Sequence, residues 1–174
     1  LIARLDKYGV KYHLRVKSLG VGLAAGVRRH TGVLTTRLKK FRERVSRFQA
    51  LRRVGVDTAR VMRTGGTAAM THGEAGLGVV PSMLLAQRRA ATAAGAPRGG
   101  LGGQELEAAA MILDGSKTGR ADPAFPAHAD VAQHWAQAIW NKWLPTDRLQ
   151  QSIEFARPRL ANTSRPWSLV HGPA

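Results

Sequence analysis

The stretch TTRLKKFRERVSRFQALRRVG, residues 35–55, predicts an amphipathic helix that organises the N-terminal half of the chain. Its apolar side chains recur every three or four residues, which is the spacing of one helix face. They are Leu38, Phe41, Val45, Phe48 and Leu51, with Leu34 and Val54 extending the series. Thr35 or Thr36 suits the N-terminal cap, and Gly55 suits the position after the helix. We therefore expect one continuous helix of about five turns.

The opposite face of this expected helix is basic. Its cations follow the same spacing of three and four residues: Arg37, Lys40, Arg44 and Arg47. Glu43 is the only acidic residue in the stretch, so like charges crowd at i,i+3 and i,i+4 positions, which costs stability. Such a ridge is either a solvated surface or a binding surface for a polyanion. A sequence that retains this unfavourable crowding of like charges indicates a nucleic-acid partner.

Positive charge is concentrated at the N-terminal end of the chain. The 174 residues carry a net charge of +16. Residues 1–63 hold seventeen Lys or Arg against Asp6, Glu43 and Asp57, a net charge of +14, which leaves +2 for residues 64–174. DNA, RNA and an anionic membrane surface are all possible partners. The basic helix has no interfacial Trp, so we expect nucleic acid rather than a membrane.

The composition excludes several classes of protein. There are no cysteines, which rules out disulfide frameworks and Cys-based zinc sites and permits a reducing compartment. No apolar run reaches membrane-spanning length and no signal peptide is visible, so we expect an intracellular protein, nuclear or cytoplasmic, that is not secreted. The chain begins at Leu1 within a helix-like stretch, and we expect it to be an internal fragment of a longer polypeptide.

Before the organising helix, the sequence predicts a small β-hairpin. Apolar and basic residues alternate over residues 10–19, which is typical of a half-buried strand with a basic outer face. Residues 19–25 are small and apolar and suit a return strand, in which Gly20 and Gly22 allow another backbone to come close. The cations expected to contact phosphates here are Lys11, Arg15 and Lys17 on the strand and Arg28 and Arg29 in the following turn.

After the organising helix, we expect further helices. Asp57 or Thr58 caps the next one, a glycine-laced segment at 68–80 follows, and Pro81 begins a helix that reaches Gly95. Residues 127–144 predict a helix with a stripe of Val131, Trp135, Ile139 and Trp143. We expect this stripe to be core, with base stacking as the alternative. Pro145 begins a last helix, whose end Pro158 should disturb.

No catalytic or metal-binding constellation emerges from the sequence. The glycines at 99–103 lack the Lys-Ser/Thr pair of a phosphate-binding loop. His128 and His134 lie about 240° apart on a helix, so they cannot share a metal with Asp130. No two carboxylates have a spacing typical of two-metal chemistry. We therefore expect no catalytic residue, metal ligand or cofactor in this chain.

Several short motifs together resemble the reverse transcriptases of non-LTR retroelements, in the region after the catalytic strands. The first is residues 17–20 (KSLG), where Ser18 replaces the family's aromatic or Asn before Leu-Gly. The second is residues 70–74 (MTHGE), similar to a Tyr-Gly-x-Glu segment, with His72 in place of the aromatic and Glu74 one residue early. The other matching segments are residues 51–55 (LRRVG), 61–65 (VMRTG), 81–89 (PSMLLAQRR), 122–125 (DPAF), 135–143 and 167–174.

The resemblance implies an architecture and a role. It implies a mainly α chain, with a thumb-like multi-helix bundle and a small N-terminal β-hairpin. Its parts would be a palm-edge hairpin remnant (1–33), a basic thumb-like domain (34–95), a linker (96–103) and a helical connector (104–174). The family's paired aspartates, which hold Mg²⁺, are absent and would lie in the missing catalytic part.

The function expected from the sequence is binding of template–primer backbone, RNA and DNA, without sequence specificity. It would be exercised as part of an RNA-directed DNA polymerase, together with the rest of the parent polypeptide. The alternative is a stand-alone basic helical adaptor that binds an acidic protein. An independent enzyme is a third reading, which the lack of a catalytic constellation disfavours.

Overall fold

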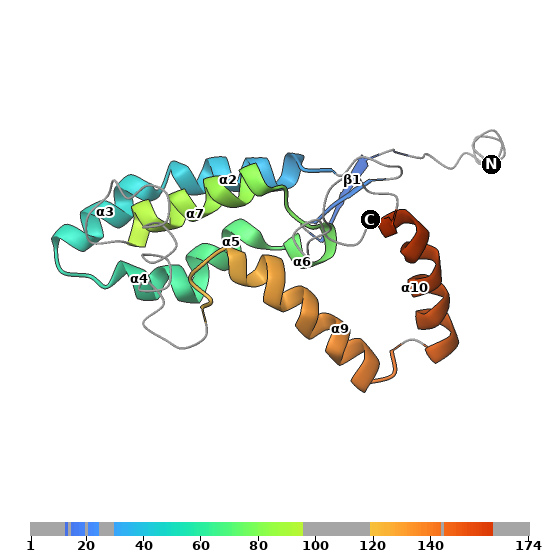
Figure 1. Cartoon of the computed structure of the whole chain (residues 1–174). Coiled ribbons are helices and arrows are strands. Elements are labelled where there is room, and N and C mark those ends of the chain that lie inside the picture. Colours follow the sequence, from blue (N-terminus) through green and yellow to red (C-terminus); the bar gives the residue numbers. More distant parts are fainter. Residues whose placement is uncertain are drawn as a thin grey trace.

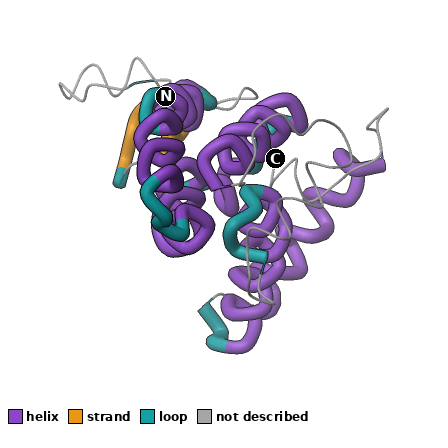
Figure 2. Tube along the Cα trace, turned by 90° about the vertical axis from the view of Figure 1, so that its left-hand side faces the viewer, coloured by secondary structure: helices purple, strands orange, loops and turns teal. Residues whose placement is uncertain are grey.

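The structure is a computed structural model that describes residues 13, 15–19, 21–24, 30–95, 119–143 and 145–161, without the side chains of 159 and 160. It is mainly helical and carries a two-stranded antiparallel hairpin near its N-terminal end, as Figures 1 and 2 show, which confirms the predicted fold class. The predicted linker at 96–103 lies outside the described residues, as do residues 104–118 of the predicted connector.

The described elements fall into three groups along the chain. The hairpin consists of β1 (Arg15–Ser18) and β2 (Val21–Ala24). The bundle consists of α2 (Gly32–Arg42), α3 (Val45–Arg53), α4 (Thr58–Val61), the π-helical turn η1 (Met62–Gly66), α5 (Thr67–Thr71), α6 (Glu74–Leu77) and α7 (Pro81–Gly95). The C-terminal elements are the π-helical turn η2 (Pro126–Asp130), α9 (Val131–Trp140) and α10 (Thr146–Ala161).

The hairpin forms where it was predicted, but its first strand is more exposed than expected. β1 and β2 pair with Val16 opposite Leu23 and Lys17 opposite Gly22. All four residues of β1 are exposed, including Val16, so the prediction of a half-buried strand is wrong here. The reason is that β2, not β1, packs against α2. Gly22 does allow a close approach, since a Cβ there would lie 2.6 Å from the carbonyl oxygen of His30.

The predicted continuous helix over residues 35–55 is two helices, α2 and α3, separated by a tight turn at Glu43 and Arg44. The amide of Arg44 donates to the carbonyl of Phe41, three residues back, at 2.9 Å. This local tightening breaks the i→i−4 ladder and bends the chain. Phe41 and Phe48 remain in contact across the turn, with ring centroids 5.7 Å apart. The apolar stripe therefore still covers the core on both sides of the bend.

Helix α7 is the centre of the bundle, because α2 and α3 pack on it from one direction and α4 and η1 from another. Its buried positions are mostly small, among them Ala90, Ala91 and Ala94. Small side chains let neighbouring helices come close, and larger residues on those helices fill the space between. The main core cluster is Leu38, Phe41, Met62, Met70, Ala90, Ala91 and Ala94.

Local signals in the sequence place several helix ends correctly. Asp57 caps α4 by accepting from the amide of Arg60 at 3.1 Å, and Pro81 begins α7, which ends at Gly95. The glycine-laced segment at 68–80 is not one helix. It breaks at His72 and Gly73, where Gly73 has a φ of 91° and separates α5 from α6.

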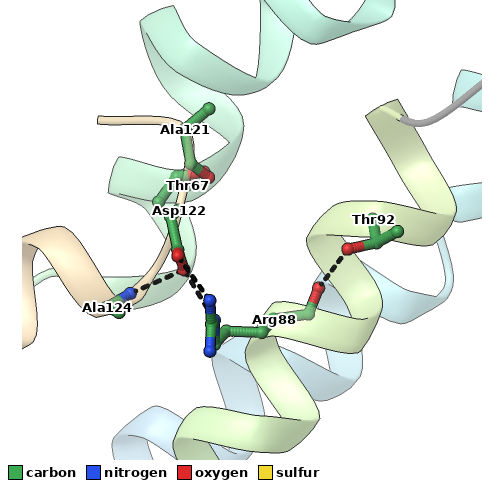
Figure 3. A network of polar contacts seen from close by, with 6 residues as sticks. All are labelled: Thr67, Arg88, Thr92, Ala121, Asp122 and Ala124. Carbon is green, nitrogen blue, oxygen red and sulfur yellow. Dashed lines mark hydrogen bonds and ion pairs between the residues drawn. The ribbon is translucent and has the colours of Figure 1, made fainter. Parts of the chain in front are cut away.

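Residues 121–127 are anchored on the bundle by polar contacts (Figure 3). The Arg88 guanidinium makes a bidentate pair with Asp122, with Nε–Oδ1 at 3.0 Å and Nη2–Oδ2 at 2.8 Å. The Thr67 hydroxyl donates to the carbonyl of Ala121 at 2.7 Å. Ala127 is buried against Val79. The first described part of the predicted connector thus packs directly on the predicted thumb-like domain.

Beyond this anchor, α9 extends away from the bundle and α10 runs back at an angle (Figure 1). Only Val131 of the predicted apolar stripe is buried. Trp135, Ile139 and Trp143 are 43%, 58% and 61% exposed, so the prediction that this stripe is core is wrong. The amphipathic pattern is real, but among the described elements η2 is the one with which α9 makes extensive contact. Pro158 lies inside α10, which continues to Ala161 instead of being disturbed there.

We expect Phe41→Ala to lower the free energy of unfolding by about 3–5 kcal/mol, because it empties the centre of the main core cluster. Urea unfolding followed by circular dichroism measures this change. Phe155→Ala is the matched control, since that ring is 66% exposed and its loss should cost far less. Equal losses in the two variants would contradict the packing described for α2.

The ion pair between Arg88 and Asp122 leads to a second prediction about stability. Asp122→Ala should lower the free energy of unfolding by about 2–4 kcal/mol, because it leaves Arg88 without its bidentate carboxylate at a poorly solvated position. Asp147→Ala, at an exposed position in α10, should stay within about 0.5 kcal/mol of the parent chain. Amide hydrogen exchange at residues 121–131 should also be faster in Asp122→Ala than in the parent chain, and unchanged in Asp147→Ala.

Candidate nucleic-acid interface

The basic ridge lies on the outer surface of α2, the 43–44 turn and α3. Its apolar neighbours Leu34, Leu38 and Phe41 are buried, which turns the intervening side chains to solvent. Lys40, Arg44 and Arg47 are all exposed, as predicted from the helix period. In the part of the chain that the structure describes, none of these three forms an ion pair. The turn at Glu43 and Arg44 bends the ridge but leaves its cations on the surface.

The sequence prediction missed further cations that the structure adds to this surface. Lys39, Arg42 and Arg53 are also exposed on the same two helices. All three lie off the narrow line, defined by steps of three and four residues, that the sequence prediction followed. On a helix that is buried along one stripe, the whole remaining arc faces solvent. The exposed basic ridge is therefore broader than a single line and consists of Lys39, Lys40, Arg42, Arg44, Arg47 and Arg53.

The hairpin cations adjoin the beginning of α2. Arg15 and Lys17 are exposed on β1, and β2 contacts α2, so the hairpin lies beside this helix, away from α3 (Figure 1). Arg44 and Arg47 lie at the other end of the ridge. Lys11, Arg28 and Arg29 lie outside the described residues. The predicted cations that the structure describes are therefore spread along the hairpin, α2 and α3 and do not gather at a single point.

Arg37 differs from the other predicted phosphate contacts. Its side chain is half-buried, and Nη1 donates to the carbonyl oxygen of His72, in the turn between α5 and α6. Nε2 of His72 lies 3.4 Å from the carbonyl oxygen of Leu19, in the hairpin turn. These contacts connect α2, the 72–73 turn and the hairpin. Arg37 thus holds structural elements together, and its charge lies below the outer ridge.

Close to Arg37 lies Glu74, a buried carboxyl group that the sequence did not mark as unusual. Its side chain has no exposed surface and accepts from the side-chain amide of Gln87, which is equally buried. Burial raises the pKa of Glu74 to about 7, while the hydrogen bond from Gln87 and the charge of Arg37 act to lower it. A single acid in a glycine-laced segment gives no sequence signal of such burial.

The described residues offer no metal site and no membrane span. No group of three or more His, Cys, Asp or Glu side chains gathers there in an arrangement that could hold a metal ion. No helix among them combines the length and apolarity needed to cross a membrane.

No protein-family model matches this chain, and no curated protein or solved structure matches it significantly. What the interface can do therefore has to follow from its own geometry. A broad row of exposed cations on a packed helical scaffold can contact successive anionic groups.

The position of Arg37 leads to a prediction about stability. We expect Arg37→Ala to lower the free energy of unfolding by about 1.5–3 kcal/mol, because a charged hydrogen bond to a backbone carbonyl is lost. Lys40→Ala removes an exposed cation about one helical turn after Arg37. It should change the free energy of unfolding by less than about 0.5 kcal/mol. Urea unfolding compares the two. A larger loss in Lys40→Ala would contradict the contacts described for Arg37.

Proposed function

We propose that this chain binds the sugar–phosphate backbone of nucleic acids without sequence specificity. The observation that carries the proposal is the exposed basic ridge of α2 and α3, where six cations lie against one acidic neighbour, Glu43. Phosphates repeat along a duplex, so a row of Lys and Arg can contact several of them at once and release counterions. Phosphate contacts position a protein on a duplex but carry no sequence information.

The motif resemblance gives this binding a context. In a reverse transcriptase of the non-LTR type, the region after the catalytic strands holds the template–primer, and the helical bundle here would serve as its thumb. The chain contains no paired aspartates of the family's kind, so it would act with the rest of a parent polypeptide that supplies Mg²⁺ and the chemistry. Template RNA and primer DNA would be the partners.

A second candidate is a basic adaptor that binds an acidic protein. The exposed Trp135 and Ile139 on α9 and Trp143 just after it favour this candidate, because exposed apolar surface commonly marks contacts between proteins. The two candidates differ in what the ridge recognises. Nucleic-acid binding should be sequence-independent and strongly salt-dependent, whereas the adaptor should show little affinity for nucleic acid and form a saturable complex with one partner.

The test is binding of the chain to labelled RNA–DNA hybrids of two unrelated sequences, measured by fluorescence anisotropy over a series of salt concentrations. We expect equal affinities for both sequences and a steep fall with salt. Arg44→Gln/Arg47→Gln should weaken binding and lower the slope of log K against log salt by about two units, since each lost phosphate contact removes about 0.9.

Arg148→Gln/Arg157→Gln is the matched control. Both arginines are exposed on α10, away from the ridge, and the variant loses the same two charges. It should bind as the parent chain does, which separates contact at the ridge from an effect of overall charge. If both double variants weaken binding equally, overall charge explains the binding and contact at the ridge is contradicted. If the parent chain binds neither hybrid, the proposal fails and the adaptor becomes the better explanation.

A further inference from the structure

Two buried polar groups meet where α6 packs near α7. The side chains of Glu74 and Gln87 have no exposed surface, and Nε2 of Gln87 donates to Oε1 of Glu74. The other oxygen of each group, Oε2 of Glu74 and Oε1 of Gln87, is buried without a hydrogen-bond partner. An ionised carboxylate only accepts hydrogen bonds. If Glu74 were ionised, two acceptors would be left unsatisfied side by side, which is costly in a buried position.

A single proton on the carboxyl group would give both Oε2 of Glu74 and Oε1 of Gln87 a hydrogen-bond partner. A carboxylic acid and a primary amide each present one donor and one acceptor on the same side, so they can form a cyclic pair with two hydrogen bonds. The bond from Gln87 Nε2 to Glu74 Oε1 is one half of such a pair. We propose that folded Glu74 carries a proton on Oε2 at mildly acidic pH and donates it in a hydrogen bond to Oε1 of Gln87, which makes the contact between α6 and α7 depend on protonation.

The electrostatic surroundings agree with this assignment. Burial is the largest influence on Glu74 and raises its pKa to about 7. The surrounding elements carry Arg37 on α2, His72 in the preceding turn, Arg88 and Arg89 on α7, and His128 and Asp130 on η2. The other cations of α2, which are Lys39, Lys40 and Arg42, are exposed. Arg37 is the one whose charge lowers the pKa of Glu74, and its guanidinium also donates to the carbonyl of His72. Arg88 is paired with Asp122.

Protonation therefore links this contact to the hairpin. Loss of the proton would leave a buried carboxylate that attracts Arg37, in competition with the His72 carbonyl. His72 in turn lies against the backbone of Leu19 in the hairpin turn. The folded pKa is raised above the ordinary value of 4.5. The stability that this proton contributes is accordingly complete below pH 4.5 and is lost as the pH rises through about 7.

The first experiment follows the carboxyl carbons of the glutamate side chains by NMR as a function of pH. We expect one resonance of the folded chain to titrate near pH 7 and to be missing in Glu74→Gln. A Glu74 resonance that titrates near pH 4.5 would overturn the proposal. Because this measurement uses the parent chain at equilibrium and needs no nucleic acid, its outcome is independent of whether the ridge binds phosphates.

The second experiment compares urea unfolding of the parent chain and Glu74→Gln between pH 5 and pH 8. Gln at this position imitates the neutral acid and can form the cyclic pair with Gln87 at any pH. The folded-to-unfolded ratio of the parent chain should fall by up to about a hundredfold more than that of the variant over this range. The histidines are retained in both chains, so the difference between the two profiles isolates Glu74.

The chain provides a matched control on its surface. On α10, Nε2 of Gln150 donates to Oε1 of Glu154 at 3.3 Å, the same pair of groups in an exposed position. Glu154→Gln should therefore keep the pH profile of the parent chain. If Glu74→Gln also keeps that profile, the protonation of Glu74 does not contribute to stability over this range, and the proposal is wrong. If Glu74→Gln fails to fold although Glu154→Gln folds, the ionised form is required at residue 74, and the proposal is wrong as well.

Discussion

The bundle depends on how closely other helices approach α7. Ala90, Ala91 and Ala94 give α7 three small buried side chains, so α2, α3, α4 and η1 can all pack against it. Alanine combines this small size with the highest helix propensity, so the close approach costs little in the stability of α7 itself. Met62 and Met70, which are unbranched and adaptable, then fill the space between the helices.

The same packing determines where charge is displayed. Because α2 and α3 turn one apolar stripe toward α7, most cations off that stripe are turned outward, and like charges crowd on the surface. Two cations differ: Arg37 lies at the edge of the stripe and reaches the carbonyl of His72, and Nη1 of Arg52 on α3 is buried. The interior is therefore not purely apolar near this edge. Arg37, Glu74 and Gln87 form a polar region between the core and the hairpin.

Features governed by neighbouring residues could be predicted from the sequence. The cap at Asp57, the helix start at Pro81 and the pairing of two strands in the hairpin follow from local signals, and the structure contains all three. The turn at Glu43 and Arg44, the inward reach of Arg37 and the burial of Glu74 depend on partners far along the chain. The exposed cations of the ridge were predicted in part, because periodicity shows which face is buried. Trp135 shows the limit, since periodicity predicts an apolar face but not what covers it.

The exposure of α9 has a practical consequence for optical work. Of the four tryptophans, Trp135, Trp140 and Trp143 lie on or just after α9, and Trp167 lies outside the described residues. Trp140 is 87% exposed, and the aromatic residues of the bundle core are phenylalanines. Among the described residues, tryptophan fluorescence thus comes from the α9 region and not from the bundle. Fluorescence and circular dichroism transitions that do not coincide would reflect where the chromophores lie, and would not by themselves indicate a folding intermediate.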